Sequence, residues 1–290
     1  MHTRVADRDR STSPAGERRE VIDCWVNVPL GEPDATASYL FPGLVERWRE
    51  AASPAGLIAQ MEAAGIARAV LVSGWGQVDS VAWIRDAVQR YPGRFAASHI
   101  VDPRLGLKTL KLIEHLVRDE GYRLIRMLAF DTQIPYGHPI CYPVYAKCAE
   151  LGVPISLNVG FPGPRVPSAC QDPFPLDEIC YRFPELTVVM AHGGEPWEDL
   201  CVKMMLKWPN LYYMTSAFSP KYYPEAIVHY LNTRGRDKVM WASDHPILPF
   251  DRCMSELTHV EFRDQLTRSR FLGENARRLF FVDAGAAPPE

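Results

Sequence analysis

The sequence predicts an α/β protein, a single-domain (β/α)8 TIM barrel. Eight short apolar runs rich in β-branched residues alternate with amphipathic stretches that have the period of a helix. A parallel sheet covered by helices produces this alternation, and eight such units are the number that closes into a barrel. A length of 290 residues, with no Gly/Ser-rich or Pro-rich linker in the body, suits one such barrel.

The eight predicted strands are apolar on both faces, as expected of strands that helices cover. In chain order they are Val21–Val26, Ala69–Ser73, Phe95–Ile100, Leu124–Met127, Pro154–Val159, Thr187–Ala191, Leu211–Met214 and Val239–Ala242. Residues 20–282 therefore make up the barrel. Residues 1–19, which are polar and rich in Arg, Ser and Glu, are expected to be a disordered tail, and residues 283–290 a second tail.

The intervening stretches predict helices from their apolar spacing. Two helices show a buried stripe, which consists of Leu107, Leu110, Ile113, Leu116 and Val117 in the first and of Val144, Cys148 and Leu151 in the second. Gly152 is expected to end the second helix. Asp79 and Ser80 are expected to cap another helix, which runs to Tyr91.

Two connections that follow strands are too long to be plain turns. Residues 29–54 follow the first predicted strand, and residues 160–175, rich in proline, follow the fifth. Because binding sites on barrels are built at the carboxyl ends of the strands, both loops are expected to form walls or lids of a pocket. Surface decoration or a subunit contact is the alternative for each.

Composition excludes several classes of partner. The net charge is −3 with both signs mixed along the chain, which argues against a nucleic acid partner or a charged membrane surface. No apolar run reaches the roughly 20 residues of a membrane span. The seven scattered cysteines fit neither a disulfide framework nor a zinc knuckle. We therefore expect reduced, buried thiols, a cytoplasmic location and a small-molecule substrate.

Several polar residues fall at the carboxyl ends of predicted strands, which is where a barrel places its catalytic groups. They are Asn27, Arg126, Asn158, His192 and Asp244. Each alone could be a satisfied structural residue. Five polar groups that converge on one end of the barrel predict a site there.

The chain resembles the amidohydrolase superfamily, in the branch that includes aminocarboxymuconate-semialdehyde decarboxylase and related decarboxylases and lactonases. Five segments carry the resemblance: Ile22-Asp23, Pro154–Gly160, Met190-Ala191-His192-Gly193-Gly194, Ala242-Ser243-Asp244-His245-Pro246 and Phe271–Phe280. They occur in the family's order and span about residues 20–282. The resemblance implies the barrel fold and an enzyme, with a homodimer as a plausible assembly.

The chain departs from the family at the metal site. By the resemblance, the three histidines that bind the catalytic metal become Trp25, Asn27 and Asn158. An indole nitrogen only donates hydrogen bonds, and neutral amide oxygens are weak zinc ligands. Alternation along the strand is expected to turn Cys24 away from the side that Trp25 faces. We therefore expect no metal and no other cofactor.

His192 and Asp244 are the expected catalytic residues. His192 is expected to transfer protons with a pKa near neutrality, and Asp244 to activate water or to orient His192. Substrate binding is expected from Trp25 as a flat apolar wall and from Asn27 and Asn158 as donors to an oxyanion. Arg126, Arg165 and His245 complete the expected substrate site, the two arginines as partners of a carboxylate. Arg126 could instead pair with an acidic residue of the barrel rim.

Three functions remain open from the sequence. The first is metal-independent hydrolysis of a lactone or ester of a carboxylated or aromatic small molecule, because such substrates have leaving groups good enough to dispense with a metal. The second is a decarboxylase or isomerase in which His192 moves the proton. The third is a pseudoenzyme that binds a small molecule without turnover.

Overall fold

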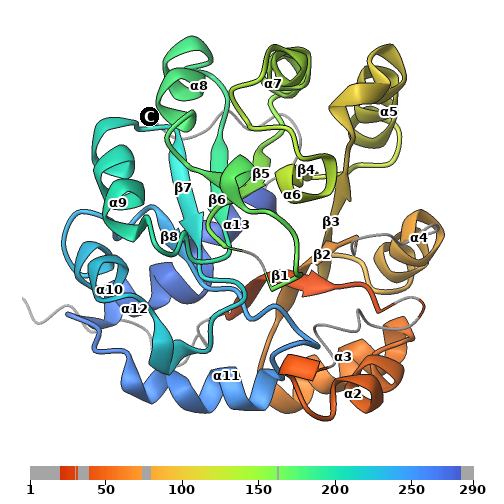
Figure 1. Ribbon diagram of the computed structural model, residues 1–290. Helices are drawn as coiled ribbons and strands as arrows, with labels where there is room; N and C mark the ends of the chain where they lie inside the picture. Colours follow the sequence, from red (N-terminus) through yellow and green to blue (C-terminus); the bar gives the residue numbers. More distant parts are fainter. Residues whose placement is uncertain (1–19, 30, 32–38, 74–79, 162, 282–290) are drawn as a thin grey trace, which may run out of the picture.

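The computed structural model describes residues 20–29, 31, 39–73, 80–161 and 163–281. Eight parallel strands follow one another around a single sheet in the order β1 to β8, and the helices form a ring around them (Figure 1). The predicted (β/α)8 barrel is therefore confirmed. The predicted tails and the capping residue Asp79 lie outside the described residues.

The strands coincide closely with the apolar runs of the sequence. They are β1 (Ile22–Asn27), β2 (Arg68–Val72), β3 (Phe95–Ile100), β4 (Leu124–Met127), β5 (Ile155–Asn158), β6 (Val188–Ala191), β7 (Leu211–Met214) and β8 (Val239–Met240). The third, fourth and seventh have the predicted bounds. The last is shorter than predicted, for a reason that concerns the site.

The helices that cover the sheet fill the remainder of the body. They are α2 (Leu44–Glu50), α3 (Pro54–Ala64), α4 (Ser80–Arg90), α5 (Leu107–Arg118), α6 (Ala129–Thr132), α7 (Tyr142–Leu151), α8 (Leu176–Arg182), α9 (Glu198–Lys207), α10 (Glu225–Leu231), α11 (Phe250–Glu256), α12 (Gln265–Ser269) and α13 (Asn275–Phe280). Gly152, with a φ of 62°, ends α7 as predicted. Among the described residues, no helix is long and apolar enough to cross a membrane.

Two apolar clusters pack on the two sides of the sheet. The inner cluster takes alternate residues of most strands, and Ala276 and Phe280 of α13 join it at the base of the barrel. The larger outer cluster joins the strands to the helices and includes Ile113 and Leu116 of α5. The predicted stripe of α5 was wrong at Leu107, which is 73% exposed because it is the first residue of the helix. All seven cysteines are buried and free, as predicted.

The first strand contains a bulge that decides which side chains reach the barrel interior. Asp23 pairs with Ala69 of β2, but the next partners are Val26 and Leu71, so β1 carries one extra residue. Cys24 and Trp25 consequently both pack in the inner cluster, whereas Val26 packs in the outer one. The expectation that Cys24 and Trp25 lie on opposite sides was wrong, because strict alternation does not hold across a bulge.

The last strand is short because side chains replace its backbone ladder. Beyond Met240, the amide of Ala242 donates to Oγ1 of Thr215 at 3.1 Å, and the amide of Ser243 donates to Oδ1 of Asp23 at 3.0 Å. The barrel closes through backbone hydrogen bonds between β1 and this segment, one of which joins the Asn27 amide to the His245 carbonyl at 2.7 Å. The end of β8 is thus shaped by residues of β1 and β7.

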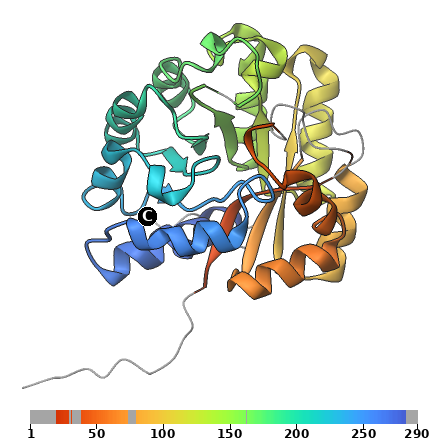
Figure 2. The same cartoon turned by 60° about the horizontal axis from the view of Figure 1, so that its bottom comes forward.

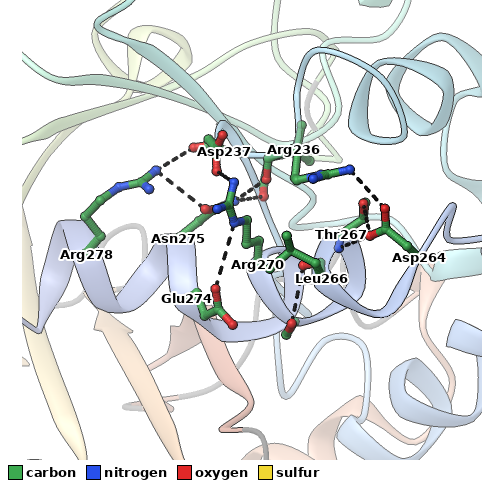
Figure 3. A network of polar contacts seen from close by, with 11 residues as sticks. Arg236, Asp237, Asp264, Leu266, Thr267, Arg270, Glu274, Asn275 and Arg278 are labelled. Carbon is green, nitrogen blue, oxygen red and sulfur yellow. Dashed lines mark hydrogen bonds and ion pairs between the residues drawn. The ribbon is translucent and has the colours of Figure 1, made fainter. Parts of the chain in front are cut away.

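The C-terminal helices hold the base of the barrel (Figure 2), where α13 contacts β1. A polar network ties them to the turn before β8 (Figure 3). Its buried member, Asn275, donates from Nδ2 to the carbonyls of Arg236 and Val239, each at 2.9 Å. Ion pairs between Arg236 and Asp264 and between Arg270 and Asp237 surround it.

Gly273 is required where the π-helical turn Arg270–Glu274 meets the start of β1. A Cβ atom at this position would lie 2.1 Å from the backbone oxygen of Glu20. We expect Gly273→Ala to lower the free energy of unfolding by about 1–3 kcal/mol, the usual cost of overpacking. Urea unfolding measures this. Gly163→Ala is the matched control, because a Cβ there meets no atom within 4 Å. Equal stability of the two variants would contradict the close approach.

Candidate functional site

The candidate site surrounds the indole of Trp25 at the carboxyl ends of the strands. Trp25 is only 2% exposed. Its ring meets the imidazole of His192 edge to face, with 4.3 Å between the ring centroids. Its Nε1 donates to Oδ1 of Asn27 at 3.3 Å. The structure therefore brings together residues of β1 and of the segment after β6 around one aromatic ring.

Arg126 of β4 supplies the positive charge of this site. Its guanidinium carbon lies 3.8 Å from the centroid of the Trp25 ring, which is a close cation–π contact. Its Nη1 donates to the carbonyl of Ser73 at 2.8 Å, and its buried Nε has no hydrogen-bond partner among the described residues. Burial lowers the pKa of Arg126 to about 9, so the group is still charged at neutral pH. No carboxylate of the described residues forms an ion pair with it, contrary to the rim-pairing alternative.

Asn27 positions Asp244. Nδ2 of Asn27 donates to Oδ1 of Asp244 at 2.8 Å, to the Asp244 carbonyl at 3.2 Å and to the His245 carbonyl at 3.1 Å. The Asp244 amide donates to the Trp25 carbonyl at 3.1 Å. The amide hydrogens of Asn27 are therefore engaged by the chain itself. In this geometry Asn27 fixes a carboxylate, which differs from the expected role as an oxyanion donor.

The pKa of Asp244 is raised from its ordinary value to about 7. Burial is the largest cause, because removal from water disfavours the charged carboxylate. Hydrogen bonds from Asn27 and Trp25 and the positive charge of Arg126 oppose the shift without cancelling it. A carboxyl group with a pKa near neutrality can both accept and donate a proton under ordinary conditions.

The pKa of His192 differs from the value near neutrality that we expected from the sequence. Burial lowers the pKa of His192 to about 3, and the positive charge of Arg126 acts in the same direction. The ring is therefore neutral at pH 7, and the expected pKa near neutrality was wrong. Its Nδ1 has no partner among the described residues. The backbone amide donates to Oγ of Ser216 on the segment after β7 at 3.2 Å.

The remaining predicted residues lie in different surroundings. Asn158 ends β5, and its buried Oδ1 has no partner within the described part of the chain. Arg165 is exposed and lies over the ring of Tyr39, 5.8 Å from its centroid, so the two long loops meet at this end of the barrel.

The ring of His245 stacks on Phe250 of α11, and its Nε2 lies 2.9 Å from Oε1 of Gln60 of α3. Its side chain thus contacts the helical layer.

Backbone strain is concentrated at this end of the barrel. Four described residues other than glycine have a positive φ: Gln133, His192, Ala217 and Asp244. They follow β4, β6, β7 and β8, in that order. Left-handed conformations cost free energy in residues with a Cβ atom and are commonest at functional sites. The two predicted catalytic residues are both held in this way.

Sequence reasoning missed several residues that hold the site together. Oδ1 of Asp23 accepts hydrogen bonds from the amides of Trp25 and Ser243, at 2.9 and 3.0 Å. The hydroxyl of Tyr136 donates to the Asn158 carbonyl at 2.6 Å. A buried acid inside an apolar strand was a signal for Asp23. Tyr136 gave none, because its contact depends on how a loop folds back.

The side chains at the centre do not form a metal site. Within the described ranges, no three His, Cys, Asp or Glu side chains are placed so that they could share a metal ion. Asp244 already accepts from Asn27, and Trp25 offers no lone pair. The guanidinium of Arg126 adds a positive charge beside them. This donor set therefore does not fit the metal that the family resemblance implies.

Comparisons with known proteins agree on the family and the fold. The sequence model of a family described as amidohydrolase matches residues 22–282. No curated protein matches the chain. Three similar solved structures are all less than 25% identical in sequence, so they show the fold alone.

The first is an uncharacterised TIM-barrel protein from Bordetella bronchiseptica, with a TM-score of 0.76, 21% identity and coverage of 92% of this chain and 100% of that one. The second is 5-carboxyvanillate decarboxylase from Sphingomonas paucimobilis, with a TM-score of 0.70, 16% identity and coverage of 91% and 99%. The third is a probable 2-pyrone-4,6-dicarboxylic acid hydrolase from Acinetobacter baumannii with citric acid bound, with a TM-score of 0.67, 16% identity and coverage of 91% and 100%.

The raised pKa of Asp244 predicts a pH-dependent effect of Asp244→Asn on stability. Because the folded protein holds the proton up to about pH 7 and the unfolded chain releases it near pH 4, stability falls as pH rises between these values. Asparagine at position 244 does not ionise, so the variant lacks this loss of stability, and its Oδ1 can still accept the hydrogen bond from Asn27. We expect the melting temperature of the variant, relative to the wild type, to rise from pH 5 to pH 8.

Thermal unfolding at several pH values measures this difference. Asp199→Asn, at an exposed carboxylate of α9, is the control and should show a constant difference. A constant difference for Asp244→Asn as well would show that Asp244 is not protonated in the folded protein near pH 6.

Proposed function

Because the chain belongs to the amidohydrolase family, we propose that it is a hydrolase that cleaves a lactone or an ester of a small molecule bearing a carboxylate, without a tightly bound catalytic metal. One observation carries the proposal. A carboxyl group with a pKa of about 7, Asp244, and a buried cation with no ion-pair partner among the described residues, Arg126, flank the same indole.

Arg126 supports the carboxylate part of the proposal. A buried guanidinium without a counterion is costly, and a bound carboxylate offsets that cost through charge-assisted hydrogen bonds. Nη1 of the guanidinium donates to the Ser73 carbonyl, and one face of the guanidinium lies on the Trp25 ring. These two contacts restrict the orientation of the guanidinium. Its Nε, which has no hydrogen-bond partner among the described residues, is our candidate donor to the substrate. A fixed fork of donors is the geometry that carboxylates prefer.

Asp244 supports the hydrolytic part. As a carboxylate it accepts a proton from a water molecule while the water oxygen bonds to the carbonyl carbon of the substrate. The C–O bond to the leaving group then breaks, and the leaving oxygen takes the proton back from Asp244. The bond from Asn27 to Oδ1 keeps the carboxyl group in one orientation through both transfers.

Two further residues contribute to the environment of this reaction. His192 is neutral, so it serves as a hydrogen-bonding and packing partner beside Trp25 and not as a proton donor. Oδ1 of Asn158 has no hydrogen-bond partner among the described residues, and Nδ2 of the same amide is our candidate donor to the developing oxyanion. These roles replace the proton transfer through His192 that the sequence suggested.

The cation of Arg126 takes over part of the work that a metal does in the family. A metal holds the substrate and stabilises negative charge. Arg126 can do both for a carboxylated substrate, and it lies against the indole that stands where the resemblance places a metal-binding histidine. Lactones and esters suit this weaker assistance because their leaving groups are better than those of amides.

Decarboxylation is the second candidate. Several similar solved structures are decarboxylases, and a protonated Asp244 could deliver a proton to carbon after CO2 leaves. The neutral His192 disfavours the form of this reaction in which His192 is the acid. Release of CO2, without incorporation of oxygen from water into the product, would identify it. Turnover of any substrate excludes the third possibility, a non-catalytic binder. A homodimer and a cytoplasmic location stay predictions.

The proposal predicts a pH profile for hydrolysis. With mono-4-nitrophenyl glutarate as a chromogenic ester, kcat/KM should fall about tenfold per pH unit below pH 7, as Asp244 becomes protonated, and decline again above about pH 9, as Arg126 loses its charge. Asp244→Asn should lower kcat by about 10²–10⁴-fold. Arg126→Met should raise KM about tenfold or more, and Arg90→Met, on the exposed side of α4, should change neither. A rate independent of pH from 5 to 8 would rule out Asp244 as the base.

Chelation tests the role of a metal. We expect hydrolysis by the purified protein to survive dialysis against EDTA, and added Mn²⁺ or Zn²⁺ to change the rate less than twofold, because the central side chains do not form a metal site. Metal content is measured in the same samples. Stoichiometric zinc or manganese, together with activity lost to EDTA and restored by the metal, would contradict the proposal.

A further inference from the structure

A cavity of about 520 Å³ opens at the same end of the barrel as the site. Its wall comes from the segments that follow β1, β6, β7 and β8 and from α11. This volume is within the range that binds small organic molecules. The cavity includes neither Arg126 nor Asp244, so nothing in the proposed reaction yet uses it.

Direct contacts connect the cavity to the site. The ring of Phe218, in the cavity wall, lies against Gly193, the residue after His192, so closely that a Cβ atom on Gly193 would be 2.1 Å from it. On the opposite wall, the amide of Leu248 donates to the carbonyl of Asp244 at 3.5 Å. The cavity therefore adjoins the backbone of Asp244 and that of Gly193, the residue next to His192.

The wall combines aromatic and apolar side chains with polar ones. Its apolar members include Phe41, Phe218, Tyr222, Tyr223 and Leu248. Tyr222 is 63% exposed in a short helical turn, Pro220–Tyr222. The hydroxyl of Tyr223 already bonds to Thr215 at 2.9 Å, so its ring face is what remains available. Such a surface binds an apolar group.

The charged groups of the wall disfavour a negatively charged ligand. Glu195 and Glu198 line the cavity and have no ion-pair partner among the described residues. The cation in the wall, Arg252, is paired with Glu256 at 3.0 Å, and Lys221 lies 3.5 Å from the same carboxylate. A second carboxylate on the ligand would therefore face unpaired carboxylates, with the wall's guanidinium already engaged.

We propose that this cavity binds the part of the substrate remote from the carboxylate that Arg126 holds, and that this part is apolar and carries no negative charge. The enzyme would then act on monocarboxylates with an apolar substituent and discriminate against dicarboxylates. This inference rests on the proposed function, because Arg126 is taken to hold the carboxylate.

Binding of simple probes tests the inference without turnover. The probes are phenylacetate, 4-phenylbutanoate and 6-phenylhexanoate, each compared by calorimetry with the unsubstituted alkanoate of the same chain length. We expect the best phenyl probe to bind at least about tenfold tighter than its alkanoate, the size expected for burial of a ring. A carboxylate added at the para position of that ring should weaken binding at least about tenfold.

Matched variants place the phenyl group in the cavity. Tyr222→Ala should remove most of the advantage of the phenyl probe and leave alkanoate binding unchanged. Tyr181→Ala, a similarly exposed tyrosine on α8, should have no effect. Glu198→Gln should reduce the penalty of the para carboxylate, whereas Glu185→Gln, an exposed residue outside the cavity, should not.

Each outcome bears on one proposal or the other. A phenyl probe that binds no better than its alkanoate, or an advantage that survives Tyr222→Ala unchanged, overturns the cavity assignment even if the enzyme hydrolyses esters through Asp244. If no lactone or ester is cleaved but the phenyl advantage depends on Tyr222, the cavity assignment stands and the hydrolase proposal falls. Binding of all probes that is unaffected by Arg126→Met would refute Arg126 as the carboxylate partner.

Discussion

One buried carboxylate oxygen, Oδ1 of Asp23, determines the shape of the barrel mouth. It accepts hydrogen bonds from the amide of Trp25 inside the bulge of β1 and from the amide of Ser243 after β8, so the first strand and the segment after the last one share this acceptor. The bulge turns Trp25 and Asn27 toward the interior, and Asn27 then fixes Asp244. Burial raises the pKa of Asp23 to about 7, which shows that this junction is kept at an electrostatic cost.

The centre of the site depends on the pairing of a cation with an aromatic ring. Arg126 lies on the face of Trp25, and its charge lowers the pKa of His192 while it helps to keep that of Asp244 from rising further. The positive charge at this site thus belongs to the protein itself, and the carboxyl group of Asp244 has the acidity of a proton carrier.

The sequence was sufficient for the barrel and for part of the set of residues at its mouth. Apolar runs with β-branched residues located all eight strands, and the rule that barrels build their sites at strand ends selected Asn27, Arg126, His192 and Asp244. It could not supply the bulge, because one extra residue in β1 is visible only against the register of β2. It also missed the low pKa of His192, which depends on burial and on a charge brought in from another strand.

The seam between β8 and β1 combines two kinds of hydrogen bond. Backbone bonds run from the Cys24 amide to the Trp241 carbonyl and from the Asn27 amide to the His245 carbonyl, and Oδ1 of Asp23 adds a side-chain acceptor for the Ser243 amide. Loss of the Asp23 carboxylate would therefore leave the backbone bonds of the seam in place. Closure of the barrel and the shape of its mouth are thus separable, because the first depends on the backbone and the second on one side chain.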